Sequence, residues 1–241
     1  MEAHKLAAVL FDAYGTLFDV HAVAVELEAW YPSRGETAAA LLREKQIEYT
    51  RLITQSDPSS SGSRHYEPFW ELTIKALRFT SKRLGLGMDE ARIGELMAAY
   101  RQLPAFAEAG EVLAALKARS LSLGVLSNAD PSMLDHVVGA AGLTRHFDHL
   151  VSIDAARQYK TAPAAYQLGA AAFGKSAHDI LFVSSNSWDA VGAKWFGYRV
   201  FWVNRRDLPF EEIGNAPDFQ GKDLRSLLLL SEFQLDLNKP A

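Results

Sequence analysis

The sequence predicts an α/β protein in which a parallel sheet is flanked by helices, and three observations lead to this fold class. Short apolar segments without helical periodicity recur along the chain. Segments with helical periodicity separate them, which is typical of parallel strands covered on both faces. The interval after the first apolar segment is much longer than one crossover helix requires, so we expect a helical subdomain in that interval.

Five segments are expected to form the strands of the sheet. Four are continuous apolar runs, and the fifth has a weaker pattern. In chain order, with the weaker segment third, they are 6–11, 121–126, 147–152, 179–183 and 198–203. A run that is apolar at every position indicates a strand buried on both faces, which favours a sheet with helices on each side.

The helices that follow the second strand have boundaries that can be read from the sequence. Asp130 followed by Pro131 predicts an N-cap and a first helical residue, and this helix should extend to Gly142. Residues 163–174 and 189–197 fit crossover helices between the later strands. These helices complete the strand–helix alternation of a parallel sheet.

The first crossover is anomalous in length. Roughly 110 residues separate the first strand from the second, whereas a strand–helix–strand unit needs about 30. A loop rich in Ser, Pro and Gly occupies 56–64, and helical patterns cover most of the remainder, at 21–30, 36–55, 67–86, 88–103 and 109–119. We therefore expect an α/β core domain formed by residues 1–18 and 105–241, and a helical cap subdomain formed by residues 19–104.

Composition limits the classes of function. The chain has 241 residues, a formal net charge of −4 and no cysteine. The absence of cysteine excludes disulfides, thiolate metal sites and a Cys nucleophile, and it fits a reducing compartment. Lys and Arg are not in excess, so the composition does not indicate nucleic acid or a membrane surface as a partner. No apolar run approaches the ~20 residues of a membrane span. We expect a cytoplasmic protein that binds neither.

Polar residues follow the predicted strands at one edge of the sheet. Asp12 ends the first strand, Ser127 and Asn128 follow the second, Lys160 lies one loop beyond the third, and the segment 184–189 follows the fourth. Ligands of open α/β sheets bind beyond the carboxyl ends of the strands. Each residue also has an ordinary interpretation, as a turn residue, a helix cap or a surface lysine. Their coincidence at one edge favours a functional site.

The histidines do not supply a catalytic base or a metal site. None of the seven stands in an HExxH or HxH pattern. His146 and His149 lie at the start of the third predicted strand, at the edge opposite the polar residues. The remaining candidate nucleophile is the carboxylate of Asp12, a group that is ordinarily ionised at neutral pH.

At this point the residues resemble a known family. The segment 11–20, "FDAYGTLFDV", resembles the first motif of the haloacid dehalogenase superfamily, in which an Asp that ends the first strand forms a covalent intermediate. Ser127 resembles the second motif of that superfamily, Lys160 the third and "SSNSWD" at 184–189 the fourth. The resemblance implies a Rossmann-like core with a helical cap inserted after the first motif.

Two positions indicate a branch of this superfamily. Most members are Mg²⁺-dependent phosphatases with a second acid two residues after the nucleophile, but this chain has Tyr14 there, and a tyrosine hydroxyl ordinarily titrates near pH ~10. Their fourth motif also begins with an acid that binds the metal, where this chain has Ser185. Both differences favour the L-2-haloacid dehalogenase branch, which residues 7–230 resemble almost throughout.

The resemblance implies hydrolytic dehalogenation of short (S)-2-haloalkanoic acids to (R)-2-hydroxy acids through an aspartyl ester, with water as the second reactant, halide as a product and no cofactor or metal. Many family members are dimers, so a homodimer is expected. A Mg²⁺-dependent phosphatase acting on a small phosphate ester and a non-catalytic binding protein are the alternatives. Halide preference, chain length and stereochemical strictness are not fixed by the sequence.

Roles for the site residues follow from the resemblance. Asp12 would attack carbon 2, and Lys160 would keep it ionised and oriented. Arg43, on the helix predicted at 36–55, would receive the departing halide with its permanent positive charge. Ser127 and Asn128 would hold the substrate carboxylate, together with main-chain N–H groups after Asp12.

A second set of residues would support the nucleophile and the water. Thr16 and Ser184 would form hydrogen bonds around Asp12. Asn186 and Asp189 would position and activate the hydrolytic water, since no histidine is near. Tyr166 would place its hydroxyl near Lys160 or Arg43.

The alkyl pocket is expected to be lined by large side chains. The resemblance assigns its walls to Tyr14, Ile47, Phe69 and Trp188, and Ala13 is small where a larger apolar residue is usual, so it is expected to enlarge the pocket.

Two loops depart from the family pattern. The loop 160–163 has its proline at Pro163 and not directly after the lysine, which puts the placement of Lys160 in question. The loop 56–64 looks longer than usual and is expected to affect substrate access.

Overall fold

The computed structural model describes residues 6–231 and contains a six-stranded sheet in which every strand pair is parallel. The order is β3-β2-β1-β4-β5-β6. The strands are β1 (Ala8–Phe11), β2 (Ser122–Ser127), β3 (His149–Ser152), β4 (Ile180–Ser184), β5 (Arg199–Val203) and β6 (Phe219–Gly221). The predicted α/β fold class, with its parallel sheet, is confirmed.

Burial explains which strands could be read from the sequence. β1 lies in the middle of the sheet and all four of its residues are buried, as its continuous apolar run predicted. β3 is an edge strand with half-buried residues, which accounts for its weaker pattern. β6 was not predicted, because it is a three-residue edge strand without an apolar run.

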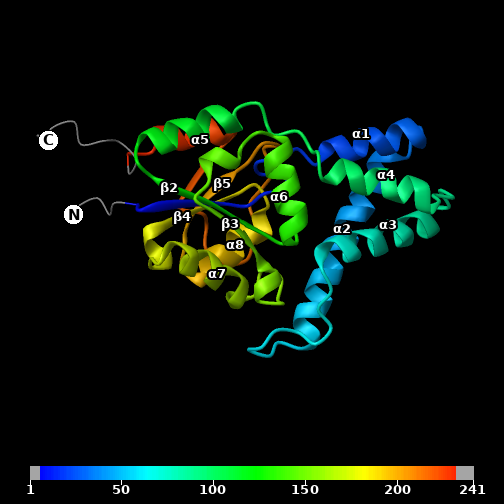
Figure 1. Ribbon diagram of the computed structural model, residues 1–241, viewed down its shortest axis with the longest axis horizontal. Coiled ribbons are helices and arrows are strands. Elements are labelled where there is room, and N and C mark those ends of the chain that lie inside the picture. The colour runs from blue at the N-terminus through cyan, green and yellow to red at the C-terminus, as the bar shows by residue number, and fades with distance from the viewer. Residues whose placement is uncertain (1–5, 232–241) are drawn as a thin grey trace, which may run out of the picture.

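Helices cover both faces of the sheet. α5 (Ala109–Ala118) and α6 (Pro131–Ala140) lie on one face, and α7 (Pro163–Phe173) and α8 (Ser187–Phe196) lie on the other (Figure 1). Asp130 caps α6 as predicted, because its Oδ1 accepts a hydrogen bond from the Met133 N–H at 3.1 Å. Pro131 and Pro163 begin their helices, where a missing N–H has no consequence.

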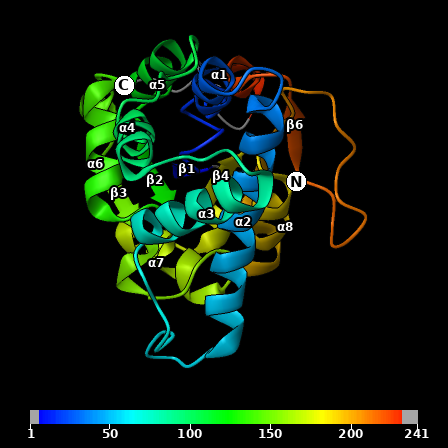
Figure 2. The same ribbon diagram turned by 90° about the vertical axis from the view of Figure 1, so that its right-hand side faces the viewer.

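Four further helices form a separate layer beyond the sheet. They are α1 (His21–Trp30), α2 (Gly35–Ser56), α3 (Phe69–Leu84) and α4 (Glu90–Tyr100). They pack on one another beyond the carboxyl ends of the strands, at the right of Figure 1 and toward the viewer in Figure 2. This layer corresponds to the predicted cap, 19–104, whose exact boundaries stay a prediction. The predicted core domain also includes 1–5 and 232–241, which lie outside the described residues.

The topology places a crevice between the two layers. β1 and β4 are neighbours at the centre of the sheet, and the chain leaves β1 directly toward α1 (Figure 1). This is the point at which the strand order reverses, where open α/β sheets bind their ligands. Within residues 6–231, none of the helices combines the length and the apolar character needed to cross a membrane.

Candidate active site

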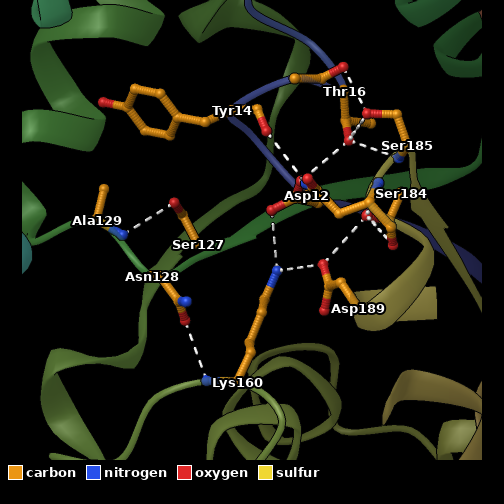
Figure 3. Close-up of polar contacts among 12 residues, drawn as sticks. Asp12, Tyr14, Thr16, Ser127, Asn128, Ala129, Lys160, Ser184, Ser185 and Asp189 are labelled. Carbon is orange, nitrogen blue, oxygen red and sulfur yellow. Dashed lines mark hydrogen bonds and ion pairs between the residues drawn. The ribbon is translucent and has the colours of Figure 1, made fainter. Parts of the chain in front are cut away.

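Asp12 is the centre of the site. It directly follows β1, and only 7% of its surface is exposed. Its Oδ1 accepts a hydrogen bond from Lys160 Nζ at 3.0 Å, and its Oδ2 accepts from Thr16 Oγ1 at 3.0 Å and from Asn186 Nδ2 at 2.8 Å (Figure 3). The carboxylate is therefore fixed in orientation by three donors from three different segments of the chain.

The chain turns away tightly after Asp12. Gly15 has a φ of 89°, a conformation that favours glycine, and its N–H donates to the Phe18 carbonyl at 2.8 Å. The Thr16 N–H donates back to the Ala13 carbonyl at 3.2 Å. Across residues 6–231, the N–H groups of Ala13 and Tyr14 have no hydrogen-bond partner. Two main-chain donors next to the Asp12 carboxylate are thus left without an acceptor, an arrangement that can bind an anion.

Lys160 joins two carboxylates. Its ammonium lies 3.0 Å from Asp12 Oδ1 and 2.9 Å from Asp189 Oδ2, and only 2% of the residue is exposed. Burial acts to lower the pKa of Lys160, but the two carboxylates outweigh it and the pKa is raised. The two carboxylates therefore favour the charged form of Lys160, which lies between Asp12 and Asp189. The altered loop still delivers the lysine to this position, and its Lys160–Thr161 peptide bond is cis.

Asp189 is completely buried on the first turn of α8. Its Oδ1 accepts from the Tyr166 hydroxyl at 2.8 Å, and its Oδ2 accepts from Lys160 Nζ and from Ser184 Oγ at 3.1 Å. Burial raises the pKa of Asp189 to about 6, with Lys160 opposing this effect and Asp12 adding to it. The N-cap of α8 is Asn186 and not Asp189. The ordinary interpretation of Asp189 as a helix cap therefore does not apply.

The structure corrects the partner expected for Ser184 and identifies the partner of Tyr166. Ser184 was expected to contact Asp12, but its Oγ donates to Asp189, because the β4–α8 turn brings these two residues together. Tyr166 was expected near Lys160 or Arg43, and its hydroxyl donates to Asp189 Oδ1, on the carboxylate whose Oδ2 accepts from Lys160. The buried Tyr166 ring lies on α7 against the sheet. Both residues therefore support Asp189, and they reach the lysine through it.

Arg43 connects the cap layer to the nucleophile. It projects from α2, and its Nη2 donates to Asn186 Oδ1 at 3.2 Å. The Nδ2 of the same Asn186 side chain donates to Asp12 Oδ2 at 2.8 Å and to the Tyr14 carbonyl at 3.2 Å. The structure thus brings Arg43, Asn186 and Asp12 into one hydrogen-bonded chain across the crevice.

Ser127 is the last residue of β2 and Asn128 follows it, on the side of Asp12 away from Ser184 and Ser185 (Figure 3). Ser127 Oγ accepts from the Ala129 N–H at 3.1 Å, and Asn128 Oδ1 accepts from the Lys160 N–H at 3.1 Å. Neither contact uses the hydroxyl proton of Ser127 or the Nδ2 group of Asn128, and both lack an acceptor within the described part of the chain. These two donors are left without an acceptor there, and their predicted role of holding the substrate carboxylate stays a prediction.

A cavity of about 1100 Å³ opens between the cap helices and the strand ends. The predicted residues that line it are Tyr14, Arg43, Ile47, Phe69, Asn186 and Trp188. Ala13 is completely buried and does not line the cavity, and Asp12, Ser127 and Asn128 are not among the lining residues either, so the expectation that Ala13 enlarges the pocket stays a prediction. The loop 56–64 does not line the cavity either, and its residues Ser59, Gly62 and Ser63 pack against residues 156–158.

Ser185 and Tyr14 occupy the two positions that distinguish branches of the superfamily. Ser185 Oγ donates to the Gly15 carbonyl at 2.5 Å, and the Ser185 N–H donates to Thr16 Oγ1 at 2.9 Å. The Tyr14 hydroxyl is buried without a partner among residues 6–231, and burial raises its pKa. No group of three or more His, Asp or Glu side chains in the described part of the chain is arranged to hold a metal ion.

Sequence reasoning missed several polar side chains at the cavity, and Gln46 is the most deeply buried of those on α2. Gln46 is almost completely buried on α2, and its Nε2 donates to Thr73 Oγ1 at 3.0 Å and to the Tyr100 hydroxyl at 3.5 Å. Both Gln46 and Tyr100 line the cavity. The available signal was spacing, since Gln46 stands three residues after Arg43 and therefore shares its helix face.

Comparisons with known proteins agree with this geometry. The family model described as a haloacid dehalogenase-like hydrolase matches residues 6–197. An (S)-2-haloacid dehalogenase of Pseudomonas sp. (strain YL) is 43% identical over 227 residues, which cover 94% of this chain and 95% of that protein. The similarity thus includes both the cap layer and the sheet.

Solved structures extend the similarity to three dimensions. A crystal structure of an L-2-haloacid dehalogenase has a TM-score of 0.90 and 48% identity, covering 93% of this chain and 98% of its own. The L-2-haloacid dehalogenase of Xanthobacter autotrophicus, with chloropropionic acid covalently bound, has a TM-score of 0.82 and 36% identity, covering 92% of this chain and 96% of its own.

Proposed function

The chain belongs to the L-2-haloacid dehalogenase family of haloacid dehalogenase-like hydrolases, and from this premise we propose the reaction that its site performs. The enzyme hydrolyses the carbon–halogen bond of short (S)-2-haloalkanoic acids and releases (R)-2-hydroxy acids. Asp12 is the nucleophile, and the reaction passes through an ester of Asp12. The chemistry requires positioning and charge stabilisation, which the side chains of this site can provide.

One observation carries this proposal. The fixed Asp12 carboxylate is surrounded by donors that have no partner within the described part of the chain, namely the N–H groups of Ala13 and Tyr14, the Ser127 hydroxyl and Asn128 Nδ2. A substrate carboxylate bound to these donors would place its carbon 2 beside the Asp12 oxygens. A nucleophile next to a receptor for an anion is the arrangement that a 2-haloacid requires.

In the first step, an Asp12 oxygen attacks carbon 2 from the side opposite the halogen. The new C–O bond forms as the carbon–halogen bond breaks, the halide leaves with the bonding electrons, and the carbon is inverted. Arg43 lines the cavity and is already oriented by Asn186. Its permanent positive charge stabilises the halide as it departs.

In the second step, water attacks the carbonyl carbon of the Asp12 ester. Asn186 faces the cavity and positions this water, while Asp189 accepts its proton. The tetrahedral species then expels the 2-hydroxy acid, whose oxygen takes the proton back from Asp189. The second proton of the water leaves the Asp12 carboxyl group for solvent, which restores the Asp12 carboxylate. Lys160 stays charged throughout and neutralises the two carboxylates in turn.

Isotope labelling under single-turnover conditions tests the ester mechanism. With excess enzyme in H₂¹⁸O and (S)-2-chloropropionate, we expect ¹⁸O in the Asp12 side chain and not in the lactate, because water attacks the carbonyl of Asp12. Asp12→Asn should release no chloride, and (R)-2-chloropropionate should be a poor substrate. Appearance of the label directly in lactate would show attack of water on carbon 2 and would exclude the ester.

We also propose the boundaries and assembly of the protein. Residues 19–104 form the cap, the enzyme works in the cytoplasm, and two copies form a homodimer. The absence of cysteine supports a reducing compartment. Exposed apolar side chains on the cap helices, such as Val25 and Leu52, support association. Light scattering coupled to size exclusion should give twice the monomer mass, and a monomer mass at micromolar concentration would contradict the dimer.

A further inference from the structure

A segment of the cap layer is fastened to the segment that carries Lys160. We call residues 54–67 the strap; it includes the end of α2 and the loop that leads to α3. The strap packs against residues 154–159, which lie between β3 and Lys160 and are distant from it in sequence (Figure 1). None of the residues that form this contact lines the cavity.

Hydrogen bonds from the strap reach each residue of the segment 157–159. The Ser63 N–H donates to the Arg157 carbonyl at 3.0 Å. The Tyr159 N–H donates to Thr54 Oγ1 at 3.0 Å, and the Tyr159 hydroxyl donates to the Glu67 carbonyl at 2.5 Å. A further bond joins the strap to the middle residue of the segment, from Gln158 Nε2 to the Ser59 carbonyl.

The two segments also approach closely at the backbone. Gly62 has a φ of 89°, and a Cβ added there would lie 2.5 Å from Arg157 Cβ and 2.7 Å from the Ala156 carbonyl oxygen. Next to it, the Tyr66 hydroxyl donates to Asp154 Oδ1 at 2.5 Å, and the Tyr66 and Tyr159 rings lie 5.4 Å apart. Only glycine fits between the strap and residues 156–157 without a shift of the backbone.

Lys160 is the residue that follows this fastened segment. On its other side, the Lys160 N–H donates to Asn128 Oδ1, and Nζ contacts Asp12 and Asp189. We propose that the strap is a positioning element for Lys160: by holding the Tyr159 backbone, it sets where the ammonium lies between the two carboxylates. Thr54 and Gly62 are its principal positioning residues, although neither touches the substrate. This inference rests on the proposed function of the site.

Thr54 gives a matched pair of variants. Thr54→Val keeps the shape of the side chain but removes the oxygen that accepts from the Tyr159 N–H, while Thr54→Ser keeps that oxygen. We expect Thr54→Val to lower kcat on (S)-2-chloropropionate by about ten-fold, because small displacements of catalytic groups are costly. KM should change less than about two-fold, since Lys160 does not bind the substrate carboxylate. Thr54→Ser should restore kcat.

Gly62 gives an independent pair. Gly62→Ala pushes the strap away from Arg157, whereas Gly87→Ala places a Cβ at another positive-φ position of the cap, with no atom within 4 Å. Both substitutions strain the backbone, but only the first changes the contact with the Lys160 segment. We expect kcat to fall in Gly62→Ala alone. Should Thr54→Val fail to fold, this pair still decides the question.

Amide hydrogen exchange separates this inference from the proposed reaction. Exchange in the peptide containing residues 157–162 should be faster in Thr54→Val and Gly62→Ala than in the wild type and the two controls. Faster exchange with unchanged kcat, or an equal loss of kcat in Thr54→Ser or Gly87→Ala, would overturn the positioning role. Unchanged exchange would overturn the fastening itself. A wild-type enzyme without halide release would instead refute the proposed function, and the exchange comparison would still show whether the strap holds the segment.

Discussion

At the scale of single residues, the site is governed by three buried charges. Lys160 lies within 3.0 Å of both Asp12 and Asp189, so one cation compensates two carboxylates. Leaving a buried carboxylate without compensation would be costly, and the additional donors Thr16, Tyr166 and Ser184 reduce that cost. The two carboxylates differ in access, because Asp189 is completely buried while Asp12 has a small exposed area.

The raised pKa of Asp189 predicts how activity falls on the acidic side of its pH profile. Burial brings this pKa to about 6, and Asp189 accepts a proton only when it is ionised. Activity should therefore rise with pH through about 6, with only about one tenth of Asp189 ionised at pH 5. Lys160 has a raised pKa and keeps its charge in the alkaline range, so we expect a plateau above pH 7. An acidic midpoint near pH 4 in the kcat profile would contradict this assignment.

Tyr166→Phe should move that midpoint to higher pH. The Tyr166 hydroxyl donates to Asp189 Oδ1 and stabilises its charged form. Losing a hydrogen bond to a charged group costs roughly 1.5–3 kcal/mol, which corresponds to a rise of roughly one to two pKa units. Tyr198→Phe is the control, because it removes a hydroxyl from the same aromatic cluster that donates to a carbonyl and not to a carboxylate. Equal midpoints in the two variants would refute the role of Tyr166.

At the scale of elements, parallel strands bring the site residues together. Asp12, Ser127 and Ser184 each lie at or just beyond the carboxyl end of a central strand, and β1 pairs with both β2 and β4. The turns then aim the side chains, as the β4–α8 turn does when it directs Ser184 to Asp189. Helices α7 and α8 must pack tightly against the sheet to hold Tyr166 and Asp189 in place.

Close packing of α7 predicts the effect of Gly169→Ala. A Cβ at Gly169 would lie 2.4 Å from Leu10 Cδ2 and 2.9 Å from the Tyr198 hydroxyl oxygen. Such overpacking should lower the free energy of unfolding by roughly 1–3 kcal/mol. Gly94→Ala, in α4 with no atom within 4 Å, should instead raise it by roughly 0.5–1 kcal/mol, because alanine favours helix. Urea denaturation measures both, and equal signs would contradict this account of α7.

At the scale of the whole molecule, the site is shared between two layers. Asp12, Lys160 and Asp189 come from the sheet side, while Arg43 comes from the cap helix α2. Hydrogen bonds join the layers at two places, between Arg43 and Asn186 and between the strap and residues 157–159. The cap therefore completes the site as well as covering it.

The charge arrangement predicts insensitivity to metal removal. Lys160 Nζ already lies between Asp12 and Asp189, and Ser185 donates to the Gly15 carbonyl at the position where a phosphatase has a metal-binding acid. We expect chelation with EDTA to leave halide release unchanged and Mg²⁺ to give no stimulation. The enzyme should also not hydrolyse p-nitrophenyl phosphate. Metal-stimulated phosphate release would require a different arrangement of these carboxylates.

The sequence by itself determined the class of the fold and the location of the site. Continuous apolar runs mark strands that are buried on both faces, so their ends could be found without coordinates. In a parallel sheet these ends meet at one edge, which is why Asp12, Ser127 and the segment 184–189 could be assigned to one site. The motifs in the same segments also indicated the family.

Only the tertiary structure decided which side chains contact each other. The partners of Ser184 and Tyr166, the burial of Ala13 and the unpredicted strand β6 all depend on packing between elements. The contact of the strap with residues 154–159 joins segments about 90 residues apart, and the loop 56–64 carries no local pattern that indicates its partner. Local sequence patterns determine the type of each element and which of its faces is buried. Contacts between distant segments are set only when the layers pack. These contacts place Lys160 between its two carboxylates.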